Sequence, residues 1–169
     1  MGAVRKADFY FGAMLSCLIN SGLAPAIIEP GDSRRIYNLT TNNGDYLLYA
    51  KYVSSPLRRQ KRDAQLWQFT FSPEEREYIR NYNGNLEKLY FSLICGREKL
   101  IDSEIAILSL DEVKDCLDID FARDSYRITI KWEKGIHGLK AYGTGRADIL
   151  NGIDNTIRIR RDILSYFKD

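Results

Sequence analysis

The stretch Arg35-Ile-Tyr-Asn-Leu-Thr-Thr-Asn-Asn-Gly-Asp-Tyr-Leu-Leu-Tyr-Ala-Lys-Tyr-Val53 decides the predicted fold. It holds two runs rich in β-branched and aromatic residues, 35–41 and 45–53, which flank Asn42-Asn43-Gly44-Asp45. Asn-Gly is the preferred centre of a two-residue type I′ turn. We therefore predict a β-hairpin whose loop residues are Asn43 and Gly44.

This turn fixes a register that puts a lysine on a mostly apolar face. With Asn43-Gly44 as the loop, Asn38 lies opposite Tyr49, and Ile36 lies opposite Lys51. Because side chains alternate along a strand, Asn38, Tyr49 and Lys51 share one face with Leu47 and Val53. One interpretation of Lys51 is structural, as a snorkelling or edge-strand lysine. The other is functional and depends on a resemblance given below.

The segments around the hairpin alternate between helix and strand signals, which predicts an α/β chain with a mixed α+β sheet. Ser72 to Glu75 and Ser109 to Glu112 are capping boxes, so each opens a helix. The apolar run 88–95 is typical of a central strand buried on both faces. In chain order we predict a helix over 3–21, an extended piece over 24–29, a strand over 67–71, a helix to about Tyr82, a strand over 88–95, a strand over 104–108, a helix to about Leu117, and a second hairpin from 126–132 and 136–142. The segment 157–167 fits a strand or a helix.

Length and composition predict one globular domain, 1–169. The chain is 44% hydrophobic and 28% charged with a net charge of +2, which excludes a disordered chain, and that small charge does not by itself indicate nucleic-acid binding. Three widely spaced cysteines indicate reduced thiols and a cytoplasmic protein. No apolar run reaches the roughly 20 residues that a membrane span needs. A single histidine, His137, argues against zinc and against a histidine-based nucleophile.

The order of these elements, together with Tyr37-Asn-Leu-Thr-Thr-Asn-Asn-Gly-Asp-Tyr-Leu-Leu-Tyr-Ala-Lys-Tyr-Val-Ser-Ser55, resembles the PD-(D/E)xK nuclease superfamily. The resemblance covers roughly residues 7–118. It implies a restriction-endonuclease-like core flanked by helices, to which the hairpin of 126–142 is an addition. In that fold a helix follows the motif hairpin, then a buried strand, then another strand that leads into a helix.

The resemblance also implies a site on the hairpin. The family motif has an acid on the first strand, and an acid or Gln two residues before a lysine on the second. Lys51 matches the lysine, whereas Asn38 and Tyr49 stand at the two acids. An active member would use Mg²⁺ or Mn²⁺, for which Asn38 and Asp8 are the candidate ligands. Because an amide and a phenol lack a carboxylate's charge, we expect a degenerate metal-dependent nuclease more readily than a working enzyme.

Basic residues follow the motif strand directly. Four of the five residues in Arg58-Arg59-Gln60-Lys61-Arg62 are cations, and Arg158, Arg160 and Arg161 form a second cluster. Such a run could neutralise phosphates of DNA or RNA, and the alternative is a solvated charged loop. The segment 98–120, with eight acids and two lysines, would repel nucleic acid.

A second hypothesis comes from another class of protein. The chain would be a small α+β module that binds a protein partner, such as an accessory or immunity protein of a bacterial defence system, and has no catalysis. Its binding surface would be an apolar patch of Tyr46, Leu48 and Tyr52 on the other hairpin face, provided that no helix covers it.

Overall fold

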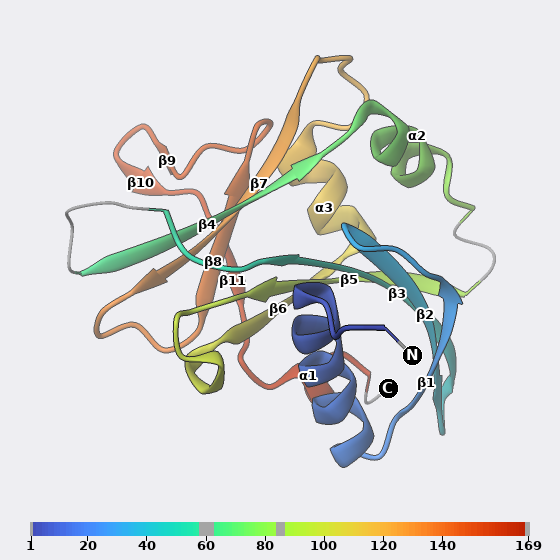
Figure 1. Cartoon of the computed structure of the whole chain (residues 1–169). Helices are drawn as coiled ribbons and strands as arrows, with labels where there is room; N and C mark the ends of the chain where they lie inside the picture. The colour runs from blue at the N-terminus through green and yellow to red at the C-terminus, as the bar shows by residue number, and fades with distance from the viewer. Residues whose placement is uncertain (1, 58–62, 84–86, 168–169) are drawn as a thin grey trace.

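The computed structural model describes residues 2–57, 63–83 and 87–167, and arranges them as two main sheets with three α-helices (Figure 1). The helices are α1 (Lys6–Asn20), α2 (Pro73–Asn81) and α3 (Leu110–Leu117). The mixed α+β fold class that the sequence predicts is therefore confirmed.

The first sheet, sheet A, contains the motif hairpin at its centre. Its strand order is β1-β2-β3-β5-β6, with bounds β1 Ala24–Glu29, β2 Arg34–Thr41, β3 Gly44–Val53, β5 Lys88–Cys95 and β6 Glu104–Ser109. β3 and β5 are parallel, and the other neighbours are antiparallel. A parallel pair needs a crossover, and here β4 with α2 provides it. β5 is buried on both faces, as its apolar run predicts.

The second sheet, sheet B, lies beside the first (Figure 1). Its order is β11-β8-β7-β4, with bounds β4 Ala64–Phe71, β7 Tyr126–Glu133, β8 Leu139–Gly143 and β11 Ile157–Ile159. The predicted second hairpin is confirmed as β7–β8. The segment 157–167 divides into β11 and a short 3₁₀ helix, Ile163–Tyr166, and another 3₁₀ helix spans Leu100–Asp102.

An apolar core lies on each face of sheet A. Sheet B, α2 and α3 pack on one face. α1 packs on the other face, where the chain's last described residue, Phe167, joins the same core. The predicted apolar patch is covered, because Tyr46 packs on Phe167, Leu48 is buried in the core that α1 covers, and Tyr52 stacks on Tyr10 of α1. These three residues therefore form no open docking surface.

The hairpin is present, but its predicted register is wrong. Thr41 pairs with Gly44, so Asn42 and Asn43 are the loop residues, Asn38 lies opposite Leu47, and Tyr49 lies opposite Ile36. Gly44 takes a positive φ of 117° after the loop. The Thr41 hydroxyl accepts from the Asn43 backbone N–H at 3.1 Å and donates to the Gly44 carbonyl at 2.8 Å. These two bonds hold the turn one residue earlier in the chain than predicted. Asn38, Tyr49 and Lys51 still share one face, as predicted, because the observed pairing differs from the predicted one by two residues and side chains alternate with a period of two.

A second Asn-Gly pair closes a hairpin that the sequence analysis missed. β9 (Ile149–Leu150) and β10 (Ile153–Asp154) pair across Asn151 and Gly152. These two residues have φ of 53° and 77°, which is the type I′ pattern. Each strand is only two residues long, which is too short for an alternating apolar pattern to be recognised in the sequence.

Both predicted capping boxes open helices. Ser72 caps α2 and Ser109 caps α3, each with reciprocal bonds to the glutamate three residues on. α1 begins at Lys6, three residues later than predicted, because Arg5 and Asp8 form its first turn. No helix in the described ranges has the length and apolar content of a membrane span.

Candidate functional site

Lys51, the residue that the hairpin motif singles out, is enclosed between the two sheets. β3 is an interior strand of sheet A, and β4 and the start of α2 lie against its Lys51. The Lys51 ammonium donates to the Thr70 carbonyl at 2.6 Å and to the two Glu75 carboxylate oxygens at 2.9 and 3.0 Å. An ammonium has three protons to donate. All of them are therefore engaged within the protein.

Glu75 is the partner of Lys51 that the sequence does not predict. It is the third residue of α2, where its backbone N–H donates to the Ser72 hydroxyl at 3.1 Å, and its Oε1 accepts from the Ser72 N–H at 3.2 Å. The capping box thus turns the carboxylate back towards β3. There it meets Lys51 and also accepts a short hydrogen bond from the Tyr49 hydroxyl. The sequence predicts the capping box, but contains no signal that α2 starts against Lys51.

Burial dominates the electrostatics of this cluster, which we call the Lys51 cluster (Tyr49, Lys51, Glu75). Removal from water disfavours an ammonium ion, and it lowers the pKa of Lys51 despite the opposing effect of Glu75. Burial, reinforced by the Glu75 carboxylate, raises the pKa of Tyr49 far above its ordinary value. The Phe71 ring lies 4.5 Å from the ammonium, which adds a cation–π contact.

The structure brings Lys51 and Tyr49 together, but not the candidate metal ligands. Asn38 is on the same face, yet it pairs with Leu47, four positions along the sheet from Lys51, or about 13 Å at the rise of a strand. Asp8 lies on the α1 side of sheet A, where it pairs with Arg35 at 3.0 Å. The Arg5 N–H bond and the Arg35 bond lower the pKa of Asp8. Asp8 therefore serves the start of α1, with the sheet between it and Lys51.

The residues around Lys51 do not fit a divalent cation. Mg²⁺ and Mn²⁺ sites are built from several free oxygen ligands. Opposite Lys51 and Tyr49 stand Arg34 and Ile36, and the oxygens of Glu75 already accept bonds from three donors. In the part of the chain that the structure describes, no group of three or more His, Cys, Asp or Glu residues is placed to hold a metal.

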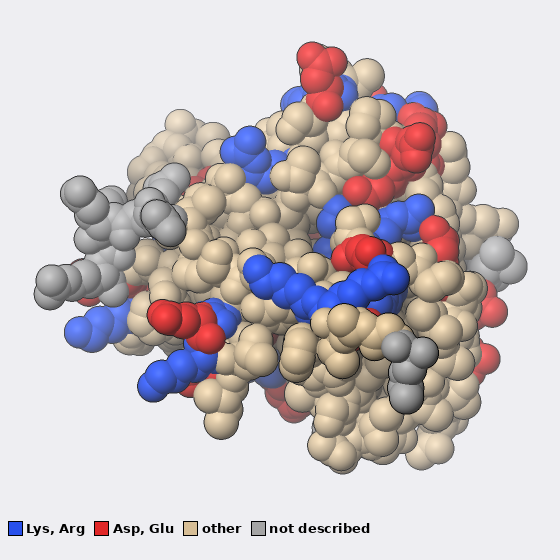
Figure 2. Space-filling view, viewed as in Figure 1, with Lys and Arg blue, Asp and Glu red and all other residues tan. Residues whose placement is uncertain are grey.

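The first basic segment, with Arg58, Arg59, Lys61 and Arg62, lies outside the described residues. The described residues that flank it, Leu57 and Asp63, are both exposed. In the second cluster, Arg158 pairs with Asp154 at 3.6 Å and Arg161 pairs with Glu104. Figure 2 shows positive and negative side chains interleaved over the face it displays, with no large region of one sign.

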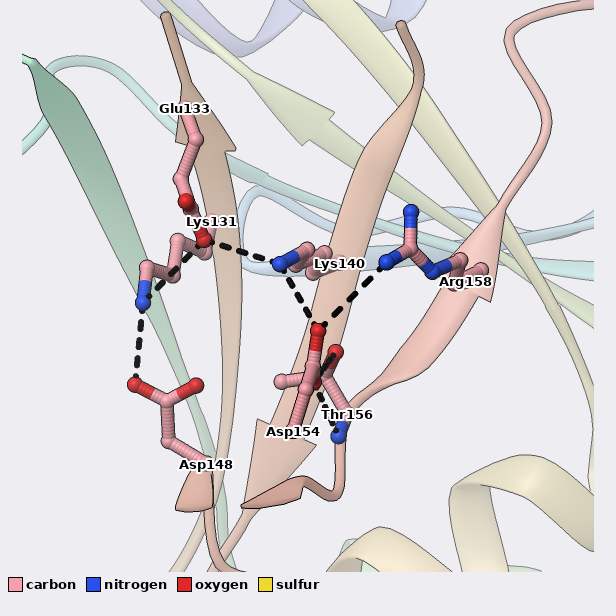
Figure 3. A network of polar contacts seen from close by, with 7 residues as sticks. All are labelled: Lys131, Glu133, Lys140, Asp148, Asp154, Thr156 and Arg158. Atoms are coloured by element: carbon pink, nitrogen blue, oxygen red, sulfur yellow. Dashed lines mark hydrogen bonds and ion pairs between the residues drawn. The ribbon is translucent and has the colours of Figure 1, made fainter. Parts of the chain in front are cut away.

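A second polar cluster covers the outer face of sheet B, which is turned away from the core. Lys131, Lys140 and Arg158 from three neighbouring strands meet Glu133, Asp148 and Asp154 (Figure 3). Lys140 bridges Glu133 at 3.0 Å and Asp154 at 2.8 Å. We call these six residues the Lys140 network. It contains three positive and three negative groups, and it ties the β9–β10 hairpin to the sheet.

The arrangement of the Lys51 cluster is that of a satisfied buried ion pair, and the Lys140 network is charge-balanced. Neither presents a free nucleophile, acid or base to a substrate. Trp67, on the strand that follows the basic segment, is buried and donates to the Gly96 carbonyl at 2.8 Å, so its ring is not open to stack on a base. No family model, curated protein or solved structure matches this chain.

Proposed function

We propose that this chain is a cytoplasmic protein that binds DNA or RNA through its basic segment without cleaving it, as a degenerate relative of the restriction-endonuclease-like fold. The observation that carries the proposal is the position of the basic residues. The strand with Lys51 ends near the exposed Leu57, and four of the next five residues are cations. Cations in that number supply enough charge for affinity to phosphate backbones.

We expect no cleavage because the Lys51 ammonium is already bound by other groups of the protein. A lysine that positions or activates water must reach the scissile phosphate. Here its ammonium is committed to Glu75 and Thr70, and its side chain is 9% exposed. The order of α1, β1, the β2–β3 hairpin and the parallel β5 supports the fold assignment, and the motif acids are absent.

The test is binding and cleavage of labelled single- and double-stranded oligonucleotides, measured by anisotropy and gel. The main variant replaces Arg58, Arg59, Lys61 and Arg62 with Gln. The matched control removes four scattered cations, Lys6, Arg80, Lys88 and Lys99, which are all exposed. For single strands we expect the main variant to lose up to about 3 in the slope of log K against log salt, and the control to lose much less.

Two results would contradict the proposal. Wild-type protein that retains no nucleic acid at low salt would remove it altogether. Cleavage in Mg²⁺ or Mn²⁺ that disappears in Lys51→Ala would show instead that Lys51 leaves Glu75 to act in catalysis.

A second candidate function, a non-catalytic protein-binding module, is favoured by the β9–β10 hairpin. Ile149, Leu150 and Ile153 there are 54–70% exposed, and three large apolar side chains on one small hairpin form a surface that a protein partner could cover. Binding of a protein partner would be insensitive to salt, in contrast to binding of phosphates.

A further inference from the structure

Beside the Lys140 network, the outer face of sheet B is hollowed. Gln68, Thr129 and Tyr142 are paired neighbours on β4, β7 and β8, so their side chains lie side by side on this face. Together with Arg127, Ser125 and Thr144 they line a hollow of about 460 Å³. That size lies within the range of small-ligand sites, about 300–1,000 Å³. We call it the Tyr142 hollow.

The charge of the Tyr142 hollow is positive. Arg127 is the charged residue of its lining, which includes no carboxylate. Within the described chain, the Arg127 guanidinium has neither a hydrogen bond nor an ion pair, and the residue is exposed. The adjacent lysines differ, because Lys131 and Lys140 are both held by carboxylates. A guanidinium without a partner beside polar, uncharged side chains is complementary to a phosphate.

The rim of the hollow is held by the backbone. The Arg127 N–H donates to the Thr144 hydroxyl at 2.9 Å, and the Thr144 N–H donates to the Arg127 carbonyl at 3.0 Å. A Cβ at Gly143 would lie 2.4 Å from the Cys116 carbonyl oxygen, so this turn sits directly on the end of α3. Tyr142 and Arg127 are thus presented by paired strands and a tightly packed turn. Such fixed side chains lose little entropy when a ligand binds.

We propose that the Tyr142 hollow holds one nucleotide of a single-stranded nucleic acid, with its base against the Tyr142 ring and its phosphate at Arg127. The inference rests on the proposed function and assigns it a second contact. Stacking requires an unpaired base and tolerates any sequence. A neighbouring hollow of about 290 Å³ shares Tyr142, but the carboxylates of Asp63, Glu133 and Asp148 line it beside Lys131. The phosphate is therefore assigned to Arg127 and not to that hollow.

The test measures the affinity of the full chain for a labelled single-stranded oligonucleotide at fixed low salt. Tyr142→Leu should bind about tenfold more weakly, whereas Tyr142→Phe, which keeps the ring, should bind like wild type. Phe9→Leu makes the same kind of change at an exposed aromatic on α1 and should have no effect. Arg127→Gln should lower the salt slope by about 0.7, and Arg127→Lys should preserve it. Far-UV circular dichroism checks that each variant folds.

The outcomes separate this inference from the proposed function. Unchanged affinity in Tyr142→Leu, with binding still lost in the variant of residues 58–62, would overturn the hollow and leave the proposed function intact. Equal dependence on Tyr142 for a duplex, or a mononucleotide that binds as tightly as the strand, would overturn its assignment to single strands. Wild-type protein that binds no nucleic acid would remove both.

Discussion

Lys51 and Lys140 occupy similar places yet differ in what their surroundings do to them. Each lies on a β-strand, each is 7% exposed, and each bonds to carboxylate oxygen at about 3 Å. The pKa of Lys51 is lowered, whereas the pKa of Lys140 is raised. Exposed fraction alone therefore does not predict the electrostatic behaviour of a lysine in this molecule.

The difference comes from the surroundings of the two ammonium groups. Lys51 has one carboxylate, Glu75, and lies between two sheets, so loss of hydration outweighs attraction. Lys140 has two, Asp154 and Glu133, whose side chains are 37% and 28% exposed. Water thus still reaches the Lys140 network. Lys51 is therefore a component of the core, while Lys140 belongs to a surface network that holds the β9–β10 hairpin.

The largest expected effect is the removal of the acid that pairs with Lys51. Glu75→Ala leaves an ammonium buried without its counter-ion, which should lower the free energy of unfolding by about 3–5 kcal/mol. Glu112→Ala is the matched control, because Glu112 has the same capping-box bonds to Ser109 and no lysine. It should cost only about 1 kcal/mol. Urea denaturation measures both, and equal losses would show that the Lys51–Glu75 pair adds nothing beyond the cap.

A double variant sharpens the same test. Lys51→Met with Glu75→Gln removes both charges, keeps the capping box and leaves an acceptor for Tyr49. Because a buried ion pair can be replaced by uncharged groups of similar volume at little cost, the double variant should be more stable than Glu75→Ala. A loss as large as in the single variant would mean that the charges themselves are needed for the fold.

The second expected effect concerns Tyr49, which the proposed resemblance places at a motif acid. Tyr49→Phe removes one donor to the Glu75 carboxylate and should lower the free energy of unfolding by about 2 kcal/mol, the scale of a hydrogen bond to a charged group. Tyr142→Phe, on the outer face of sheet B, should change it by less than about 0.5 kcal/mol. Thermal unfolding of the two variants compares them directly, and equal melting temperatures would indicate that Tyr49 contributes only through its ring.

Part of the Lys51 cluster can be predicted from the sequence, and part cannot. Face sharing by Tyr49 and Lys51 follows from the period of a strand, and the helix at Ser72 follows from its capping box. The contact between Glu75 and Lys51 depends on tertiary structure, because it requires β4 to join sheet B and to place the start of α2 against β3. The alternation of Trp67, Phe69 and Phe71 indicates a buried face, but does not indicate which sheet the strand joins.

The two Asn-Gly pairs show the same limit at the level of turns. Asn151-Gly152 forms the type I′ turn, and Asn43-Gly44 does not, because the Thr41 side chain holds the loop one residue earlier. A tight turn forms at the dipeptide in both places, although only the one at Asn43-Gly44 was predicted. The dipeptide does not predict which two residues occupy the loop, and that choice decides the cross-strand partners of Asn38 and Tyr49.

The third expected effect is on the Lys140 network. Lys140→Met should lower the free energy of unfolding by about 1 kcal/mol, because its partners are partly exposed and solvent screens them. The loss should shrink in 1 M NaCl, where screening acts within about 3 Å. The loss in Glu75→Ala should keep most of its size in the same salt. Urea denaturation at low and high salt checks this, and a loss in Lys140→Met that ignores salt would place Lys140 in the core, with Lys51.

The smallest expected effect is a difference in sign on the alkaline side. Lys51 has a folded pKa below its unfolded value, so between these values the unfolded chain binds more protons, and the contribution of Lys51 to stability rises with pH. Lys140 has a folded pKa above its unfolded value, so its contribution is complete below the unfolded pKa and is lost as pH rises through the folded one. As the pH rises towards the unfolded lysine pKa of about 10.4, the stability of wild type relative to the Lys51→Met, Glu75→Gln variant should rise, and as the pH rises beyond that value the stability relative to Lys140→Met should fall. Burial, the largest cause of the raised pKa of Tyr49, is kept in each variant, so we expect the effect of Tyr49 to cancel largely in these differences. If both stability differences changed in the same direction with pH, the two lysines would have equivalent surroundings. That result would contradict the distinction between a core lysine and a surface-network lysine.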